Sequence, residues 1–400
     1  MRALLITLLL IPKIYADDWP GWLGPQRNGV SREELPKADF GKIAWRAKIG
    51  VGFSSMAVAD GRLFALGCTG KRRGNQETFW SLNAANGKIL FKNTYPAKLV
   101  DNLHEGGPCA TPTVDEGRVY AQAKDGQLFC HSTGSGRLIW KAELMKLAEM
   151  PRPPEWGFAA SPLVLGKLLI VEATFTVALD KMTGKEVWRS RAYRPAYGSP
   201  VAFEFKDKTY IATLKTDGLV ILDAANGKTM AIQDWRTSFR TNSITPMVIG
   251  NKIFISTGYR RGCALFEFTG TGLKQIYTNK NLSNHMNNSV VIGDHLYGFD
   301  GNTHMLGPKQ LVCLRLADGK VQWRRDGFRC GSLIGVKDHL LVLGEKGNLA
   351  LGLASPKAFQ PTAEGQVLTG KCWTPPVYAN GRIYARNAAG DLVCIDARAD

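Results

Sequence analysis

The residues that could do chemistry in this chain lie between its apolar runs and do not form one compact motif. His104 and Glu105 place an imidazole beside a carboxylate, two groups that serve in acid–base catalysis. The other candidates are cationic, amide-bearing, imidazole or aromatic side chains, namely Arg240, Arg329, Lys371, Asn242, Asn287, His285, Trp156, Tyr197 and Trp373. The cations could receive a carboxylate or a phosphate, and the amides and the second imidazole could orient polar groups. Loop hydrogen bonding and simple solvation explain the same residues equally well, so their roles stay open.

Several enzyme classes lack their motifs here. The sequence contains no Gly-x-Ser-x-Gly nucleophile elbow, no phosphate-binding loop and no His-Glu-x-x-His. It also has no Cys-x-x-Cys and no Cys/His spacing suited to zinc. Hydrolysis by paired carboxylates stays open, but no residue pattern points to it.

The elements that must position these side chains come from an internal repeat. The clearest unit, residues 117–140, reads as strand, Asp-Gly turn, strand, turn and strand. A glycine followed four residues later by Trp or another apolar residue, Ile276 among them, marks the phase, at Gly41, Gly87, Gly136, Gly184, Gly227, Gly272, Gly319 and Gly365. The copies at Gly227 and Gly365 are degenerate at the apolar position. A period near 46 residues with four strands per unit is typical of a β-propeller blade. Eight markers therefore predict an all-β, eight-bladed propeller of four-stranded antiparallel blades.

The two ends of the repeat predict how the ring closes. The last unit ends at Asp400 without its Gly-x-x-x-Trp strand, and the first copy, Gly41 to Trp45, has no strands before it. We expect residues 42–49 to supply the outer strand of the last blade, which removes an open sheet edge. The repeated tryptophans Trp45, Trp140, Trp188 and Trp323 should pack between neighbouring blades, not bind a cofactor.

The repeat resembles that of the pyrroloquinoline-quinone-like (PQQ-like) propeller family, through Ala178-Leu179-Asp180 followed by Thr183-Gly184-Lys185 and Trp188. The resemblance covers residues 41–400 and implies the fold. Residues 19–29 resemble a leader of exported family members, so we expect residues 17–40 to be an extended segment docked on the propeller. A short helix over 143–149 and a Pro-rich connector should form an insertion between the second and third blades.

The first sixteen residues predict export. Arg2 precedes an apolar run from Ala3 to Ile11, and Ala16 is a small residue where a signal peptide would be cleaved. No later apolar run is long enough to cross a bilayer, so we expect a periplasmic or secreted protein without a transmembrane segment. Removal of residues 1–16 leaves 49 basic and 34 acidic residues, a net charge of +15. This surplus suits either a solvated surface or an anionic partner.

The chain has eight cysteines, and export permits disulfides, but the sequence does not choose among their 105 pairings. There is no specific nucleic-acid motif. In a propeller, the loops from each outer strand to the next inner strand surround the channel on one face. The candidate residues above fall in those loops, together with Phe53, Cys109, Asn288, Cys330 and Cys372. We therefore expect a ligand site at the mouth of the channel.

The resemblance raises two functions. PQQ-dependent quinoprotein dehydrogenases, which oxidise alcohols or sugars, hold the quinone between a tryptophan and a disulfide of adjacent cysteines, with calcium on Glu, Asn and Asp. Here no two cysteines are adjacent, and Glu105 is the one acidic candidate in the loops. The favoured hypothesis is a non-catalytic exported binding or scaffold module with an unknown protein partner or anionic ligand in the cell envelope. It needs no cofactor, and PQQ with calcium belongs to the alternative alone. The propeller lipoprotein of the outer-membrane assembly machine is such a relative, but this chain lacks its lipid-bearing cysteine.

Overall fold

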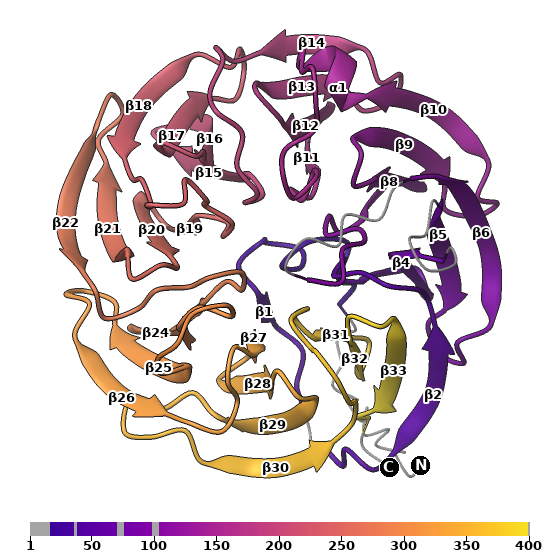
Figure 1. Ribbon diagram of the computed structural model, residues 1–400, viewed down its shortest axis with the longest axis vertical. Helices are drawn as coiled ribbons and strands as arrows, with labels where there is room; N and C mark the ends of the chain where they lie inside the picture. Colours follow the sequence, from indigo (N-terminus) through magenta and orange to yellow (C-terminus); the bar gives the residue numbers. More distant parts are fainter. Residues whose placement is uncertain (1–16, 36–37, 70–75, 98–103, 399–400) are drawn as a thin grey trace, which may run out of the picture.

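The computed structural model describes residues 17–35, 38–69, 76–97 and 104–398, and these form a ring of eight β-sheets around a channel (Figure 1). The expected eight-bladed propeller is confirmed. The predicted signal peptide, residues 1–16, lies outside the described residues. Helix α1 (Leu144–Leu147) lies in the predicted insertion but is shorter than expected. No helix in the described part of the chain is long and apolar enough to cross a membrane.

Each blade has four antiparallel strands, which are named below from the channel outward. The first blade consists of β3 (Ala57–Ala59), β4 (Arg62–Cys68), β5 (Gln76–Asn83) and β6 (Ile89–Pro96), and the second of β7 (Thr113–Asp115), β8 (Arg118–Gln122), β9 (Gln127–Ser132) and β10 (Leu138–Glu143). The third blade consists of β11 (Leu163–Leu165), β12 (Leu168–Glu172), β13 (Thr176–Asp180) and β14 (Glu186–Arg189). The fourth consists of β15 (Val201–Phe205), β16 (Lys208–Leu214), β17 (Gly218–Asp223) and β18 (Thr229–Asp234).

The last four blades follow the same order. The fifth blade consists of β19 (Met247–Ile249), β20 (Lys252–Thr257), β21 (Gly262–Phe268) and β22 (Leu273–Asn279), and the sixth of β23 (Val290–Ile292), β24 (His295–Asp300), β25 (Gln310–Arg315) and β26 (Val321–Arg325). The seventh blade consists of β27 (Ser332–Val336), β28 (His339–Leu343), β29 (Asn348–Leu353) and β30 (Pro361–Gln366). The eighth consists of β31 (Val377–Ala379), β32 (Arg382–Arg386), β33 (Asp391–Asp396) and β2 (Ile43–Lys48).

The repeated glycines sit under the aromatic side chains of the preceding blade. A Cβ on Gly87 would lie 2.7 Å from the Trp45 indole, and one on Gly184 would lie 2.7 Å from the Trp140 indole. Both glycines also have a positive φ, near 71–72°. The position therefore requires glycine for two reasons, the turn conformation and the close approach of the ring. Phe91 on Gly136 and Trp188 on Gly227 repeat the contact.

The fifth blade departs from the expected pattern. Ile276 was expected to be its marker residue, but Ile276 is 39% exposed. Tyr277 packs over Gly319 instead, 2.6 Å from the position of a Cβ there. All eight blades share a register shift before the outermost strand, so the difference lies in the hairpin. In the fifth blade, Phe268 pairs with Leu273 directly after Gly272, and the residue opposite Leu265 is Tyr277, five and not four positions after this glycine.

The ring closes as predicted, through β2. This strand pairs antiparallel with β33, with Trp45 opposite Cys394 and Lys48 opposite Asp391. Trp45 also donates its indole N–H to the Ala84 carbonyl of the first blade at 3.1 Å. The junction between the last and first blades thus has the same aromatic–glycine contact as its neighbours.

The segment 17–35, called the plug below, crosses the centre of the ring (indigo in Figure 1). It contacts the innermost strands of several blades, through β1 (Val30–Ser31) parallel to β27, a bridge between Trp19 and Val58, and bonds to Val114, Pro162 and Gly381. We expected an extended segment, but residues 22–27 form turns. Positive φ at Leu23, Gly24 and Arg27 lets the chain reverse inside the channel.

We predict that Trp45→Ala lowers the free energy of unfolding by about 3–5 kcal/mol, because it leaves a cavity at the closing junction. Denaturant unfolding followed by circular dichroism measures this change. Lys48→Ala is the matched control, since it removes from the same strand an exposed ion pair to Asp391. It should cost about 1 kcal/mol or less. Equal effects of the two substitutions would contradict the importance of the aromatic contact.

Candidate ligand-binding site

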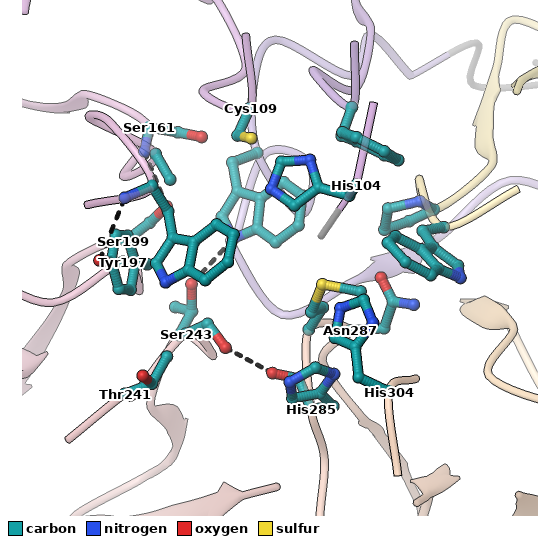
Figure 2. A pocket seen from close by; sticks show the side chains of 18 of the residues that line it. His104, Cys109, Ser161, Tyr197, Ser199, Thr241, Ser243, His285, Asn287 and His304 are labelled. Carbon is teal, nitrogen blue, oxygen red and sulfur yellow. Dashed lines mark hydrogen bonds between the residues drawn. The ribbon is translucent and has the colours of Figure 1, made fainter. Parts of the chain in front are cut away.

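A cavity lies at the end of the channel where the loops lead into the innermost strands, and it encloses about 1040 Å³ including its open mouth (Figure 2). Nine of the nineteen described residues that line it have aromatic rings, namely Trp22, Phe53, His104, Trp156, Tyr197, Tyr259, His285, His304 and Trp373. The others are small, apolar or hydroxyl- and amide-bearing, namely Cys109, Ala159, Ser161, Ser199, Thr241, Ser243, Thr245, Met286, Asn287 and Pro375.

The rings contact one another in sequence around the mouth. His104 stacks on Trp156 with ring centroids 5.4 Å apart, and Phe53 meets the edge of His104 at 5.3 Å. Phe53 also stacks on Trp373 at 5.5 Å, and His304 meets Trp373 edge-on at 5.8 Å. These five rings come from five different loops, so the propeller assembles this aromatic wall from distant parts of the sequence.

The wall continues on the other side of the mouth. His285 lies edge-on to His304 at 5.8 Å and to Tyr259 at 5.1 Å. One His285 ring nitrogen lies 3.1 Å from the Tyr259 hydroxyl, and the other lies 3.0 Å from the Thr303 hydroxyl. Its backbone carbonyl accepts a hydrogen bond from Ser243. His285 is therefore held on three sides before any ligand enters.

The plug supplies the base of the cavity. The Trp22 indole N–H donates to the Thr245 hydroxyl at 2.8 Å. Trp22 also lines a second hollow, at the opposite ends of β7 and β11, together with Arg27. Arg27 donates to the carbonyls of Ser161 and Pro162, and burial lowers its pKa to about 9. Trp22 thus separates two spaces at opposite ends of the innermost strands.

A circle of hydrogen bonds joins each blade to the next around the cavity. Ser55 N–H donates to Thr111 at 3.2 Å, Thr111 N–H to Ser161 at 2.9 Å, and Ser161 N–H to Ser199 at 2.8 Å. The circle continues through Tyr197 N to Asn242 O (2.9 Å), Thr245 N to Asn288 Oδ1 (3.1 Å), Asn287 Nδ2 to Gly331 O (2.8 Å), Ser332 Oγ to Thr374 O (3.0 Å) and Thr374 Oγ1 to Phe53 O (3.1 Å). Much of the polar lining is therefore structural.

The described residues of the lining carry no charge at neutral pH. Burial lowers the pKa of His104 to about 4 and that of His285 to about 3, and burial also lowers the pKa of His304. Lys124 and Lys371 add to the effect on His104, because their positive charge opposes protonation. None of the described lining residues is Asp, Glu, Lys or Arg. Within the part of the chain that the structure describes, the site offers aromatic faces, neutral imidazoles and hydroxyls, but no fixed charge.

Six of the predicted site residues line this cavity: His104, Trp156, Tyr197, His285, Asn287 and Trp373. The other five lie elsewhere. Asn242 is fully buried and donates to the carbonyls of Lys215, Thr216 and Trp235, so it ties loops together. Arg240 is exposed on the loop before β19.

The remaining charged candidates form ion pairs outside the lining. Lys371 lies 2.8 Å from Glu105, and its ammonium sits 4.3 Å from the Trp373 ring centroid. Arg329 lies 3.1 Å from Glu345. Glu105 therefore faces a lysine and not the neighbouring imidazole, and each cation already has a carboxylate partner. A ligand-binding role for these residues stays a prediction.

Sequence reasoning missed two groups of lining residues. Tyr259 and His304 come from loops between the second and third strands of a blade, which reach the same face but were not considered. Ser161, Ser199 and Thr245 belong to Ser-Pro or Thr-Pro pairs directly before the first strand of a blade, a recurrence visible in the sequence. No local signal places Trp22 at the base, because its contact with Thr245 spans 223 residues.

Comparisons with known proteins agree with this architecture. A family model described as outer membrane protein assembly factor BamB matches residues 35–151 and 104–325. The chain belongs to this family of PQQ-like propellers. No curated protein matches the sequence of this PQQ-like propeller significantly.

Solved structures share the fold of this PQQ-like propeller at low sequence identity. BamB from Moraxella catarrhalis has a TM-score of 0.63 and 15% identity, over 88% of this chain and 99% of that chain. Quinohemoprotein alcohol dehydrogenase from Comamonas testosteroni has a TM-score of 0.67 and 11% identity, over 96% of this chain and 81% of that chain. A europium-containing methanol dehydrogenase has a TM-score of 0.62 and 10% identity, over 92% of this chain and 89% of that chain. The likeness thus includes both an assembly factor and enzymes.

The cavity of this PQQ-like propeller does not fit a quinone with calcium. Calcium takes six to eight oxygen ligands, usually with carboxylates among them, and the described lining has none. No group of three or more His, Cys, Asp or Glu side chains that could hold a metal occurs among the described residues. Cys109 lines the cavity as a free thiol, and no cysteine adjoins it in sequence.

We predict that the propeller loses stability as the pH falls from about 6.5 toward 4. An unfolded histidine binds its proton near pH 6.5, whereas folded His285 binds one only near pH 3, so acid favours the unfolded chain. His285→Gln should reduce the loss by up to about 1.4 kcal/mol per pH unit. Thermal unfolding at several pH values measures it, with the surface variant His339→Gln as control. Parallel pH profiles for His285→Gln and the wild type would contradict the assignment.

Proposed function

We propose that this exported propeller is a non-catalytic binding or scaffold module that holds an uncharged, ring-bearing ligand in the aromatic cavity. One observation carries the proposal: the described lining combines nine aromatic side chains with no charged one. Flat rings gain from such a site through burial and stacking on Trp, Phe and His faces. Ser, Thr and Asn side chains at the base and sides can accept or donate a few orienting hydrogen bonds.

This proposal replaces the anionic ligand expected from the net charge. The basic side chains predicted at the mouth lie outside the lining, and two of them, Lys371 and Arg329, pair with carboxylates. An anion entering the cavity would lose its hydration without meeting a fixed positive charge. The excess of basic residues therefore lies outside the described lining, where it can contact the surroundings of the protein. The cavity itself suits a neutral group.

The family relation supports a location in the cell envelope and a protein partner. Two exposed apolar side chains stand two positions from lining residues in the sequence, Leu306 (95% exposed) after His304 and Phe239 (63% exposed) before Thr241. Phe239 packs on Tyr259 of the aromatic wall, with ring centroids 4.6 Å apart. A partner that covers this rim would bury both side chains and face the cavity, which suits a scaffold role.

Indole and indole-3-acetate form a matched pair of probes, because the two differ mainly by a carboxylate. We expect isothermal titration calorimetry to show one indole per protein and weaker binding of the anion. Trp156→Ala should weaken indole binding about tenfold or more, since it removes a stacking face. Val187→Ala, an exposed change on the outer strand β14, is the control and should leave the affinity unchanged. Tighter binding of indole-3-acetate, or full affinity in Trp156→Ala, would refute the proposal.

The alternative is a PQQ-dependent dehydrogenase acting on an alcohol or sugar. We expect that PQQ and calcium added to the purified protein produce no shift in quinone absorbance and no reduction of an electron-accepting dye. The reason is the absence of carboxylates and cations from the described lining. Saturable dye reduction that depends on both PQQ and an alcohol would establish the enzyme instead.

A further inference from the structure

The first residues of the plug are fixed against the last and first blades. Asp18 accepts hydrogen bonds from the Asn380 side chain at 3.1 Å and from the Asp60 backbone N–H at 3.2 Å. Trp19 exchanges two backbone hydrogen bonds with Val58, of 2.7 and 2.8 Å. The nitrogen of Asp17 therefore has a defined position, one residue before this anchored pair.

Glu33, at the other end of the plug, lies at the same place. Its carboxylate accepts the backbone N–H groups of Asn380 at 2.7 Å and Gly381 at 2.9 Å. The residue is only 3% exposed, and burial raises its pKa. No ion pair to Glu33 is found within the described ranges of the chain. A buried carboxylate without a counter-ion is costly, so the structure leaves a place for a positive charge.

The nitrogen of Asp17 can become positive beside Glu33, because Asp18 and Glu33 share Asn380 as a hydrogen-bond partner. The backbone N–H of Asp17 lowers the pKa of the Glu33 carboxyl, whereas the negative charge of the Asp17 side chain raises it. In the precursor this nitrogen belongs to the neutral Ala16–Asp17 peptide bond. Hydrolysis of that bond consumes one water and leaves a carboxylate on Ala16 and an α-ammonium on Asp17.

We propose that signal-peptide removal after Ala16 creates a buried ion pair between the new α-ammonium of Asp17 and the carboxylate of Glu33. The inference rests on the predicted cleavage site and not on the ligand of the cavity. The ion pair joins the two ends of the plug, and the plug carries Trp22, the base of the cavity. Processing of the precursor thus locks the binding site in its final form.

The test compares the processed chain, beginning at Asp17, with the same chain beginning at Ala16, whose ammonium is displaced by one residue. We expect the Asp17 chain to melt higher by about 5 °C in thermal unfolding. Glu33→Gln should abolish the difference between the two chains, because the amide keeps the shape but loses the charge. Glu34→Gln is the matched control, since exposed Glu34 pairs with Lys337, and it should keep the difference.

A second measurement does not depend on stability. The α-amine of the Asp17 chain should react more slowly with an acylating reagent at pH 7 than that of the Ala16 chain, and Glu33→Gln should remove this protection. Mass spectrometry of the exported protein should give Asp17 as its first residue. Equal melting temperatures and equal amine reactivity for the two chains, or a different first residue, would overturn the proposal. Loss of indole binding alone would not affect it.

Discussion

The pairing of β2 with β33 holds the rest of the molecule together, because it makes the last blade from the two ends of the chain. Without it, β33 would present an open edge and Trp45 would not cover Gly87. The chain leaving β2 is fixed at once, since Ile49 N–H donates to the Gly390 carbonyl and the Ile49 carbonyl accepts from Trp80. Phe53, four residues later, starts the aromatic wall, so the site depends directly on this closure.

The sequence predicted the architecture because the blade pattern is local. Asn380-Gly381 has positive φ at both residues, as a tight hairpin requires, and such pairs mark the turns along the chain. The tryptophans four positions after Gly41, Gly136, Gly184 and Gly319 could be interpreted as packing residues before their partners were known. The exception, Tyr277 in place of Ile276, follows from the hairpin between β21 and β22, where the residue opposite Leu265 stands five and not four positions after Gly272.

The site was predicted only in part because its chemistry depends on contacts between distant residues. Position in the loops brought His104, Trp156 and Trp373 to the cavity, as expected. The basic side chain of Lys371 suggested a binding group for an anion. Lys371 instead forms an ion pair with Glu105, which lies 266 positions away in the sequence. The turn-forming plug was expected to be extended, since no local pattern indicates that a channel will surround it. Distance along the chain, and not the residue types, limited the prediction.

The hydrogen-bond circle and the plug together limit the passage of molecules through the ring. Trp22 and its neighbours occupy the axis, so a molecule that arrives at the aromatic wall must leave by the route it came in. Long polymers cannot be threaded from one face of the disc to the other. A chain-like partner would instead present one terminus or one side group, end-on, while the remainder stays outside. The cavity is thus open toward one face of the ring and closed by the plug toward the other.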